Sequence, residues 1–325
     1  MTEPGPELVA DLEKAPGDLI ILGVAGKMGP TLARMAKRAA PSRRVIGVAR
    51  FSEAGVRERL TAQGIECISA DLLDPAALAA LPDAPNVIYM AGRKFGSQGA
   101  EDLTWAMNSY APALVAERYG RSRMVYFSTG CVYPYVPVLS GGATEDTPIV
   151  PPAGDYANSC VGRERMFQYG CRKHGTKGAA IRLNYAIDMR YGVLHDVASK
   201  VFAGQPIDIS TGHVNVIWQG DANSMALRAL ARAAAPHVAF NVSGPETVSI
   251  RWLAQAFGRR FGRKPEFTGV EAESCWLVNT ARSLAIFGYP RVPLHRMIDW
   301  VGAWVEGGGD SLGKETHYDV RDGVF

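Results

Sequence analysis

The chain has 325 residues, of which 47% are hydrophobic and 21% charged, a balance typical of a globular protein with one large or two smaller domains. Its formal net charge of +3 is small, and basic residues alternate with acidic ones along most predicted helices, so no nucleic-acid partner is expected. No uninterrupted apolar run reaches the length of about 18 residues that would span a membrane, and we predict no membrane association.

The N-terminal segment and the cysteines indicate a cytoplasmic protein. Residues 1–17 are polar and acidic, lack the basic start and apolar stretch of a signal peptide, and are interpreted as a frayed lead-in. The five cysteines form no CxxC pair, which fits reduced thiols better than disulfides or a zinc site. The six histidines are scattered, so no metal site is predicted.

Short apolar runs alternate with helical stretches from Asp18 to Asn184, the pattern of βαβ units around a parallel sheet. The predicted strands are 19–22, 45–48, 65–69, 87–90, 124–127 and 179–183. Their apolarity is continuous rather than alternating, which indicates helices on both faces. Residues 1–184 are therefore predicted to form an α/β, doubly wound parallel-sheet Rossmann domain that binds its ligand at the carboxyl ends of the strands.

The pattern loosens after Tyr185, where Pro and Gly separate shorter elements. We interpret 185–325 mainly as a smaller C-terminal α/β substrate lobe, with 213–236 returning to the Rossmann domain. Short strands are expected at 206–209 and 240–242, and helices at 221–235, 250–261 and 294–305. The tail 307–325 is polar and Gly-rich and is interpreted as a loose extension.

A glycine cluster follows the first predicted strand and precedes a helical stretch, and it reads Gly23-Val24-Ala25-Gly26-Lys27-Met28-Gly29. Glycines at this spacing permit a tight turn, close approach of backbone N–H groups to a pyrophosphate, and close packing of helix on strand. The helix N-terminus adds a partial positive charge. The loop therefore predicts a dinucleotide site.

Further motifs stand at later strand ends and helix starts: Asp71-Leu72, Ala91-Gly92, Asn108, Ser128-Thr129-Gly130-Cys131-Val132-Tyr133, Tyr156, Pro206-Ile207, Trp218-Gln219-Gly220-Asp221 and Phe240-Asn241-Val242-Ser243-Gly244-Pro245. With them the chain resembles, over nearly its whole length, the extended short-chain dehydrogenase/reductase superfamily of NAD(P)-dependent epimerases and dehydratases. The resemblance implies a set of cofactor-binding residues: Gly23, Gly26, Lys27, Met28, Gly29, Arg50, Asp71, Leu72, Ala91, Gly92, Asn108 and Tyr156. Asp71 would accept a hydrogen bond from the adenine amino group, and the alternative is a helix cap or turn before Pro75.

The end of the second predicted strand bears on which nicotinamide cofactor binds. An NAD enzyme usually places an acid here to bond the ribose 2′-hydroxyl, but Ala49 holds that position and Arg50 follows. A guanidinium suits a 2′-phosphate, and Lys27 would add charge, so NADP(H) is favoured over NAD(H). The alternative is that Arg50 is a solvated residue at a strand end.

The resemblance makes Thr129 and Tyr156 the expected catalytic pair: Thr129 orients the substrate oxygen, and Tyr156 exchanges the proton that accompanies hydride transfer. A tyrosine with its usual pKa of about 10 needs a nearby cation to act as a base near neutrality. The family supplies a lysine four residues later, one helical turn on and on the same face. Cys160 stands at that position here, which puts this part of the family mechanism in doubt.

Three interpretations of the substitution are open. A cation from elsewhere replaces the lysine, with Arg93, Lys94 and Arg163 as candidates; or Tyr156 acts as a neutral acid or hydrogen-bond donor; or the site is degenerate and only binds the cofactor. A neutral thiol does not lower the pKa of Tyr156 by charge, and a thiolate would raise it. No partner histidine is evident nearby, so Cys160 is interpreted as a buried, inert thiol, and Cys160→Lys is expected to keep the fold and tighten cofactor binding.

The substrate pocket is expected to be bordered by the loop Arg93–Ser97 and by several polar or aromatic side chains: Lys94, Tyr133, Asn184, Arg190, His195 and Trp218. The predicted function is NAD(P)-dependent oxidoreduction, or epimerisation or dehydration, of a sugar-like or polyhydroxylated small molecule by hydride transfer. The alternative is a dinucleotide-binding sensor or scaffold protein without turnover. The resemblance also suggests a homodimer formed through the helices after the fourth and fifth strands.

Overall fold

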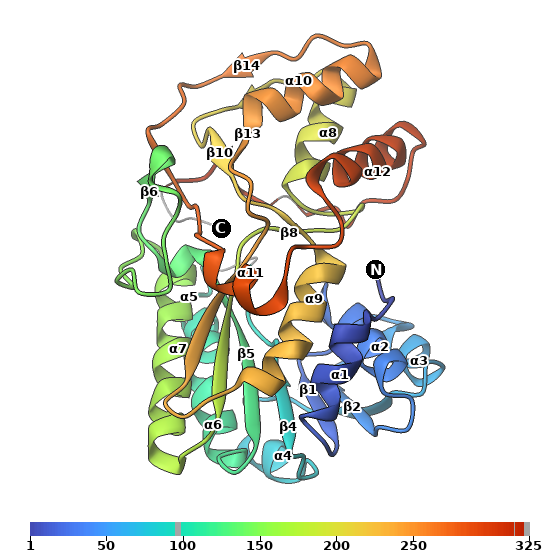
Figure 1. Cartoon of the computed structure of the whole chain (residues 1–325), viewed down its shortest axis with the longest axis vertical. Helices are drawn as coiled ribbons and strands as arrows, with labels where there is room; N and C mark the ends of the chain where they lie inside the picture. The colour runs from blue at the N-terminus through green and yellow to red at the C-terminus, as the bar shows by residue number, and fades with distance from the viewer. Residues whose placement is uncertain (95–98, 315, 322–325) are drawn as a thin grey trace.

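A sheet of seven parallel strands, in the order β12-β7-β5-β4-β1-β2-β3, forms the centre of the computed structural model (Figure 1), which describes residues 1–94, 99–314 and 316–321. The strands are β1 (Leu19–Leu22), β2 (Val45–Ala49), β3 (Glu66–Ser69), β4 (Asn86–Tyr89), β5 (Arg123–Thr129), β7 (Gly178–Leu183) and β12 (Val238–Val242). Each of the six predicted apolar runs forms one of these strands. The predicted doubly wound α/β fold is confirmed.

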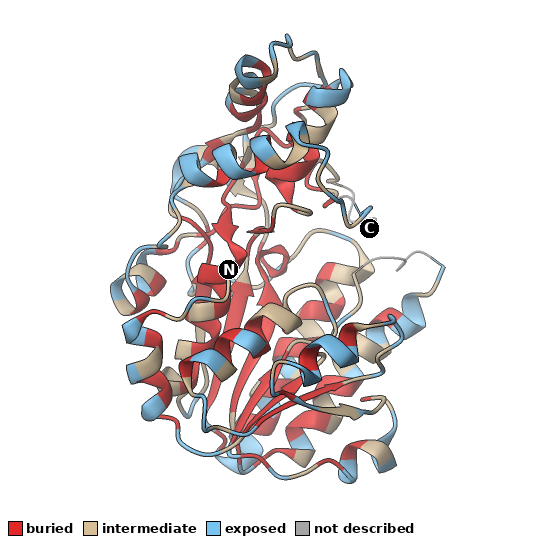
Figure 2. Cartoon of the chain, turned by 90° about the vertical axis from the view of Figure 1, so that its right-hand side faces the viewer, coloured by how far each residue is buried: buried red, intermediate tan, exposed pale blue. Residues whose placement is uncertain are grey.

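Helices cover both faces of the sheet, which explains the continuous apolarity of the strands. One face packs on α1 (Pro6–Glu13), α2 (Gly29–Ala39), α3 (Val56–Thr61) and α9 (Gln219–Arg228). The other packs on α4 (Pro75–Ala79), α6 (Ala111–Arg118) and α7 (Asp155–His174). Tyr126 of β5 stacks on Phe167 of α7 with ring centroids 4.4 Å apart. Apart from the edge strand β3, the strands are consequently buried along most of their length (Figure 2).

The first 17 residues are not a frayed lead-in, because helix α1 packs against α9. Leu8 and Leu12 are fully buried or nearly so. Asp11 is 3% exposed, and its carboxylate accepts a hydrogen bond from Arg228 Nε at 2.9 Å. The polar composition of the segment obscured the i, i+4 spacing of its two leucines, which marks an amphipathic helix.

A second core lies beyond the carboxyl ends of the strands, at the top of Figure 1. It is formed mainly by α8 (Val193–Ala203), α10 (Ile250–Phe261) and α12 (Leu294–Glu306), with β9 (Ile207–Asp208), β10 (His213–Val214) and β13 (Val248–Ser249). The segment 213–236, which was expected to return to the Rossmann domain, ends just before β12, the last strand of the main sheet. The remaining elements are α5 (Glu101–Trp105), η1 (Ala106–Tyr110), η2 (Gly130–Val132), β6 (Val136–Pro137), η3 (Val138–Ser140), β8 (Ala186–Ile187), β11 (Ile217–Trp218), η4 (Ala229–Arg232), β14 (Phe267–Thr268), β15 (Ser274–Cys275) and α11 (Ala281–Phe287).

The tail after α12 is a packed strap rather than a loose extension. Thr316 and Tyr318 are each 2% exposed. The backbone N–H of Thr316 donates to Asp196 Oδ2 on α8 at 2.8 Å. Further along, the Arg321 guanidinium lies 4.1 Å from the centre of the Tyr135 ring. The described part of the tail therefore crosses the second core and returns towards the carboxyl edge of the sheet.

Candidate cofactor and catalytic site

The glycine loop lies at the carboxyl edge, between the end of β1 and the start of α2. Gly23 has a φ of +89°, and a Cβ added there would lie 2.5 Å from the backbone nitrogen of Ala91 after β4. A Cβ on Gly29 would lie 2.1 Å from the Val24 carbonyl oxygen, so α2 packs directly on the loop. Gly26 is exposed, and a Cβ there would meet only the Gly23 oxygen, at 3.5 Å. This open backbone cradle at a helix N-terminus fits the pyrophosphate of a dinucleotide.

The Lys27 ammonium binds groups within the protein, which differs from its expected role of adding charge for a 2′-phosphate. Its Nζ donates to the Ala186 carbonyl at 2.8 Å and lies 4.6 Å from the centre of the Tyr191 ring. Burial lowers the pKa of Lys27 to about 7, against the opposing charge of Asp188. The ammonium thus joins the glycine loop to the segment after β7, and charge for a 2′-phosphate would have to come from elsewhere.

The residues expected around the adenosine lie at the ends of β2 and β3. Asp71 Oδ1 accepts a hydrogen bond from the Leu73 N–H at 3.0 Å, so its carboxylate stabilises a turn. Asp74, not Asp71, caps α4. Leu72 is 5% exposed and belongs to the core. Arg50 is exposed immediately after β2 and leaves its guanidinium at the surface.

Thr129 ends β5, and Tyr156 lies in the first turn of α7. The Thr129 hydroxyl accepts a hydrogen bond from the Cys131 N–H at 3.2 Å. Burial raises the pKa of Tyr156 well above its usual value, Cys160 and Cys131 act in the same direction, and Arg163 and hydrogen bonding with Thr129 oppose them. The structure therefore brings the expected pair together with Cys160, and burial disfavours ionisation of the phenol in the free chain.

Cys160 is fully buried on α7, one helical turn after Tyr156. Burial raises the pKa of its thiol, and this effect outweighs the opposing charge of Arg163. Burial therefore disfavours the thiolate form of Cys160.

Asn108 holds the loop after β4 against α7. Its Nδ2 donates to the Arg93 carbonyl and to Ser159 Oγ, both at 2.9 Å, and its Oδ1 accepts from the Arg93 N–H at 2.9 Å. Arg163 Nη2 donates to the same Oδ1. The bonds fix the backbone just beyond Gly92, at the place where the cofactor is expected to pass. Asn108 therefore acts on this segment as a buried positioning residue.

Lys94 links the tail to Tyr156 near the start of α7. Its Nζ donates to the Thr316 carbonyl at 2.8 Å and lies 5.9 Å from the centre of the Tyr156 ring. Burial lowers the pKa of the Lys94 ammonium. Residues 95–97, the rest of the loop expected to border the pocket, lie outside the described residues.

Two of the side chains expected around the substrate are structural. Tyr133 is 1% exposed, and its hydroxyl accepts from Arg182 Nη1 at 2.6 Å and donates to Asn241 Oδ1 at 2.8 Å. Trp218 is 5% exposed in the second core and packs edge-on against Trp300. Their aromatic character suggested a pocket wall, but both rings are enclosed by packing.

The other three lie between the two cores with differing exposure. Asn184 is buried, and its Nδ2 donates to the Trp276 carbonyl at 3.2 Å. His195 is buried, with Nε2 at 3.1 Å from Ser311 Oγ in the tail. Arg190 pairs with Asp188 at 2.9 Å and keeps 41% of its side chain exposed. Arg190 is thus the one of these three that presents charge to solvent.

Glu164 is a residue that the sequence argument missed. It is fully buried, accepts from Ser128 Oγ at 2.6 Å, and binds Arg182 through both carboxylate oxygens at 3.0 and 2.9 Å. The ion pair with Arg182 braces α7 against β7, and the hydrogen bond from Ser128 braces it against β5. The sequence offered one signal for Glu164: it follows Cys160 by four residues and therefore lies on the same helix face.

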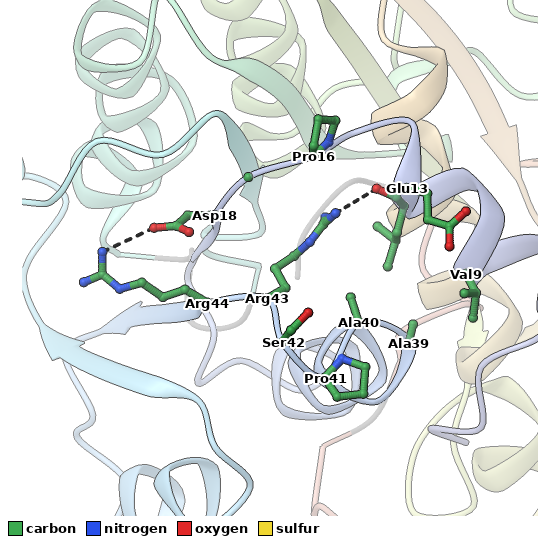
Figure 3. A pocket seen from close by; sticks show the side chains of 12 residues that line it. Val9, Glu13, Pro16, Asp18, Ala39, Ala40, Pro41, Ser42, Arg43 and Arg44 are labelled. Carbon is green, nitrogen blue, oxygen red and sulfur yellow. Dashed lines mark hydrogen bonds and ion pairs between the residues drawn. The ribbon is translucent and has the colours of Figure 1, made fainter.

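A surface pocket lies at the opposite end of the sheet, where β1 and β2 begin (Figure 3). Arg43 Nη2 donates to the Leu12 carbonyl there at 2.7 Å, and Arg44 pairs with Asp18. The strands of a parallel sheet present ligands at their carboxyl ends, so this pocket is not the cofactor site.

Within residues 1–94, 99–314 and 316–321, no three side chains of the metal-ligating types gather into one cluster. No helix in the same part of the chain is long and apolar enough to cross a membrane.

The parallel sheet, the glycine cradle and the convergence of Thr129 and Tyr156 define a dinucleotide-binding protein of the Rossmann class. The chain belongs to the NAD-dependent epimerase/dehydratase family, whose sequence model matches residues 19–212. It is therefore, in coarse terms, an NAD-dependent enzyme of the epimerase or dehydratase type that uses a nicotinamide dinucleotide and a small-molecule substrate.

Solved structures share the fold at low sequence identity. Pal from Bacillus thuringiensis is 18% identical with a TM-score of 0.73, and the match covers 89% of this chain and 99% of that one. Thermus thermophilus UDP-glucose 4-epimerase, solved with NAD, is 20% identical with a TM-score of 0.71 and the same coverage. Bacillus cereus UDP-glucuronic acid 4-epimerase, also solved with NAD, is 16% identical with a TM-score of 0.74 and again the same coverage. No match is found among curated protein sequences.

Proposed function

We propose that this chain is an NAD(P)-dependent oxidoreductase or epimerase/dehydratase that acts on a sugar-like or polyhydroxylated small molecule. The observation that carries the proposal is that Thr129, at the end of β5, and Tyr156, at the start of α7, lie at the same carboxyl edge of the sheet as the glycine cradle. A nicotinamide cofactor bound in the cradle would supply hydride transfer at a carbinol carbon of the substrate. The Thr129 hydroxyl orients the substrate oxygen, and the Tyr156 phenol exchanges its proton. The part built on the second core, mainly 185–325, contributes substrate contacts, with Arg190 available for an anionic group.

The test begins with fluorescence titrations of the purified protein with NADPH and with NADH, followed by a screen of sugars and nucleotide sugars for turnover. Tyr156→Phe is expected to abolish turnover while leaving cofactor affinity within about threefold, because the ring and its packing remain. Binding of neither cofactor would refute the proposal. Cofactor binding without turnover on any substrate would favour a sensor or scaffold protein.

Arg50 supports a preference for NADP(H) because its guanidinium is exposed beyond β2, where a 2′-phosphate would lie. We expect Arg50→Ala to reduce the preference for NADPH over NADH by about tenfold, or about 1.4 kcal/mol. Arg59→Ala removes an exposed arginine from the neighbouring helix α3 and is the control. An unchanged ratio of the two affinities in Arg50→Ala would remove the phosphate role.

A homodimer through α5, η1 and α7 is also proposed. Large apolar side chains are exposed there: Leu103, Trp105, Tyr110 and Tyr169. Light scattering after size exclusion tests this, and Tyr110→Glu should shift a dimer towards monomer because it places a charge in the apolar patch.

A further inference from the structure

We propose that Arg163 is the fixed positive charge that serves Tyr156 in place of the lysine that is absent at position 160. The inference rests on the proposed function, since it assigns the cation that the proton exchange requires. Tyr156, Cys160 and Arg163 all lie on helix α7. Arg163 follows Tyr156 by seven residues and Cys160 by three, so the three side chains share a face of the helix. The arginine thus lies on α7 in the turn that follows Cys160.

The surroundings of Arg163 place its guanidinium at the edge of the candidate site. Nη1 donates to the Phe127 carbonyl of β5 at 3.0 Å, and Nη2 donates to Asn108 Oδ1. A Cβ added to Gly92 would lie 2.4 Å from Nη2, so the guanidinium packs directly against the segment after β4. It therefore lies under the backbone where the cofactor is expected to pass.

The guanidinium is charged but has no carboxylate partner of its own. Arg163 is 6% exposed, and among the described residues no carboxylate forms an ion pair with it, because its neighbour Glu164 is bound to Arg182. Its Nε is buried without a hydrogen-bond partner. Hydrogen bonds to Phe127 and Asn108 offset part of the cost of burying this charge, and an anion formed near it in the working cycle would be stabilised by it. A tyrosinate at Tyr156 is such an anion.

The electrostatic relations agree with this assignment. Burial acts to lower the pKa of Arg163, yet the pKa is raised overall because Cys160, Tyr89, Tyr156 and the nearby Glu164 carboxylate favour its charged form. Arg163 in turn opposes the rise in the pKa of Tyr156. The other titratable groups around the phenol are Cys160 on the same helix, Cys131 in η2 and Lys94 over the ring. Burial lowers the pKa of the Lys94 ammonium, which makes it a weaker source of fixed charge than a guanidinium.

The direct test measures ionisation of the phenol in the free protein. A fluorinated tyrosine at position 156 ionises at lower pH than tyrosine, and its fluorine NMR signal reports the charge. Arg163→Gln should raise the phenol pKa by about one unit or more, because it removes an adjacent positive charge. Arg163→Lys should keep the phenol pKa close to that of the parent protein. Arg165→Gln, an exposed arginine on the same helix, is the matched control and should leave it unchanged.

Rescue separates an electrostatic role from a structural one. Cys160→Lys added to Arg163→Gln returns a cation to the helix face and should bring the phenol pKa back down. If Arg163→Gln does not fold alone, the test compares Cys160→Lys with the double variant Cys160→Lys/Arg163→Gln. The double variant must then have the higher phenol pKa. An unchanged pKa in the folded Arg163→Gln protein would overturn the inference, as would a rise produced by Lys94→Met alone.

Parallel titrations with NADPH and NADH keep the two proposals apart. If the parent protein binds neither cofactor, the proposed function fails even where the phenol responds to Arg163. If the parent binds cofactor and the phenol ignores Arg163, only the assignment of the cation fails.

Discussion

Lys27 makes the stability of the fold depend on pH in a predictable direction. Its pKa is lowered to about 7 in the folded chain by burial, and its ammonium is held at the Ala186 carbonyl. Between that pKa and the higher value of a solvated lysine, the unfolded chain binds more protons than the folded one. The free energy of unfolding therefore rises with pH over this window, by at most about 1.4 kcal/mol per pH unit, and by about 2 kcal/mol from pH 7 to pH 9.

Lys27→Met removes the titrating group and keeps much of the side-chain volume. Urea denaturation of both proteins, followed by circular dichroism at pH 7, 8 and 9, gives the difference in their free energies of unfolding. Across this pH range the free energy of unfolding of the parent protein should rise by about 2 kcal/mol relative to that of the variant. A constant difference from the lost hydrogen bond is expected in addition. Lys37→Met supplies the baseline, because Lys37 also donates to a backbone carbonyl, that of Arg43, at 2.9 Å. If the difference between the two free energies of unfolding does not change with pH, Lys27 keeps its ordinary pKa in the folded chain, and the reasoning from its burial is refuted.

Two further substitutions test the cradle and the brace behind it. Gly29→Ala should lower the free energy of unfolding by several kcal/mol and weaken cofactor binding, because its Cβ would lie 2.1 Å from the Val24 oxygen; Gly26→Ala should leave stability nearly unchanged, and equal thermal melts for the two would contradict the geometry. Glu164→Gln leaves the buried Arg182 charge without its partner and should lower stability by about 3 to 5 kcal/mol, so a loss below about 1 kcal/mol in urea melts would mean that Arg182 finds compensation elsewhere.

Much of the fold was predictable because its signals are local. Each strand of the Rossmann half is a run of adjacent apolar residues, and the glycine loop is a stretch of seven consecutive positions whose spacing follows from backbone sterics. Thr129 and Tyr156 could be placed at the same edge because the strands of a parallel sheet end together. Cys160, at a position where the resemblance implies a lysine, was likewise visible in the sequence.

What the sequence did not reveal is where the long polar side chains reach. Lys27 bonds the carbonyl of a residue 159 positions away, and Lys94 bonds one 222 positions away. Tyr133 lies four residues after Thr129 yet contributes its hydroxyl to a buried network with Arg182. The strand positions follow from short-range patterning, whereas these contacts depend on how the second core and the tail close over the sheet edge. Only the tertiary structure decides which buried charges lie beside Tyr156, because the energy of a buried charge depends on every element packed around it.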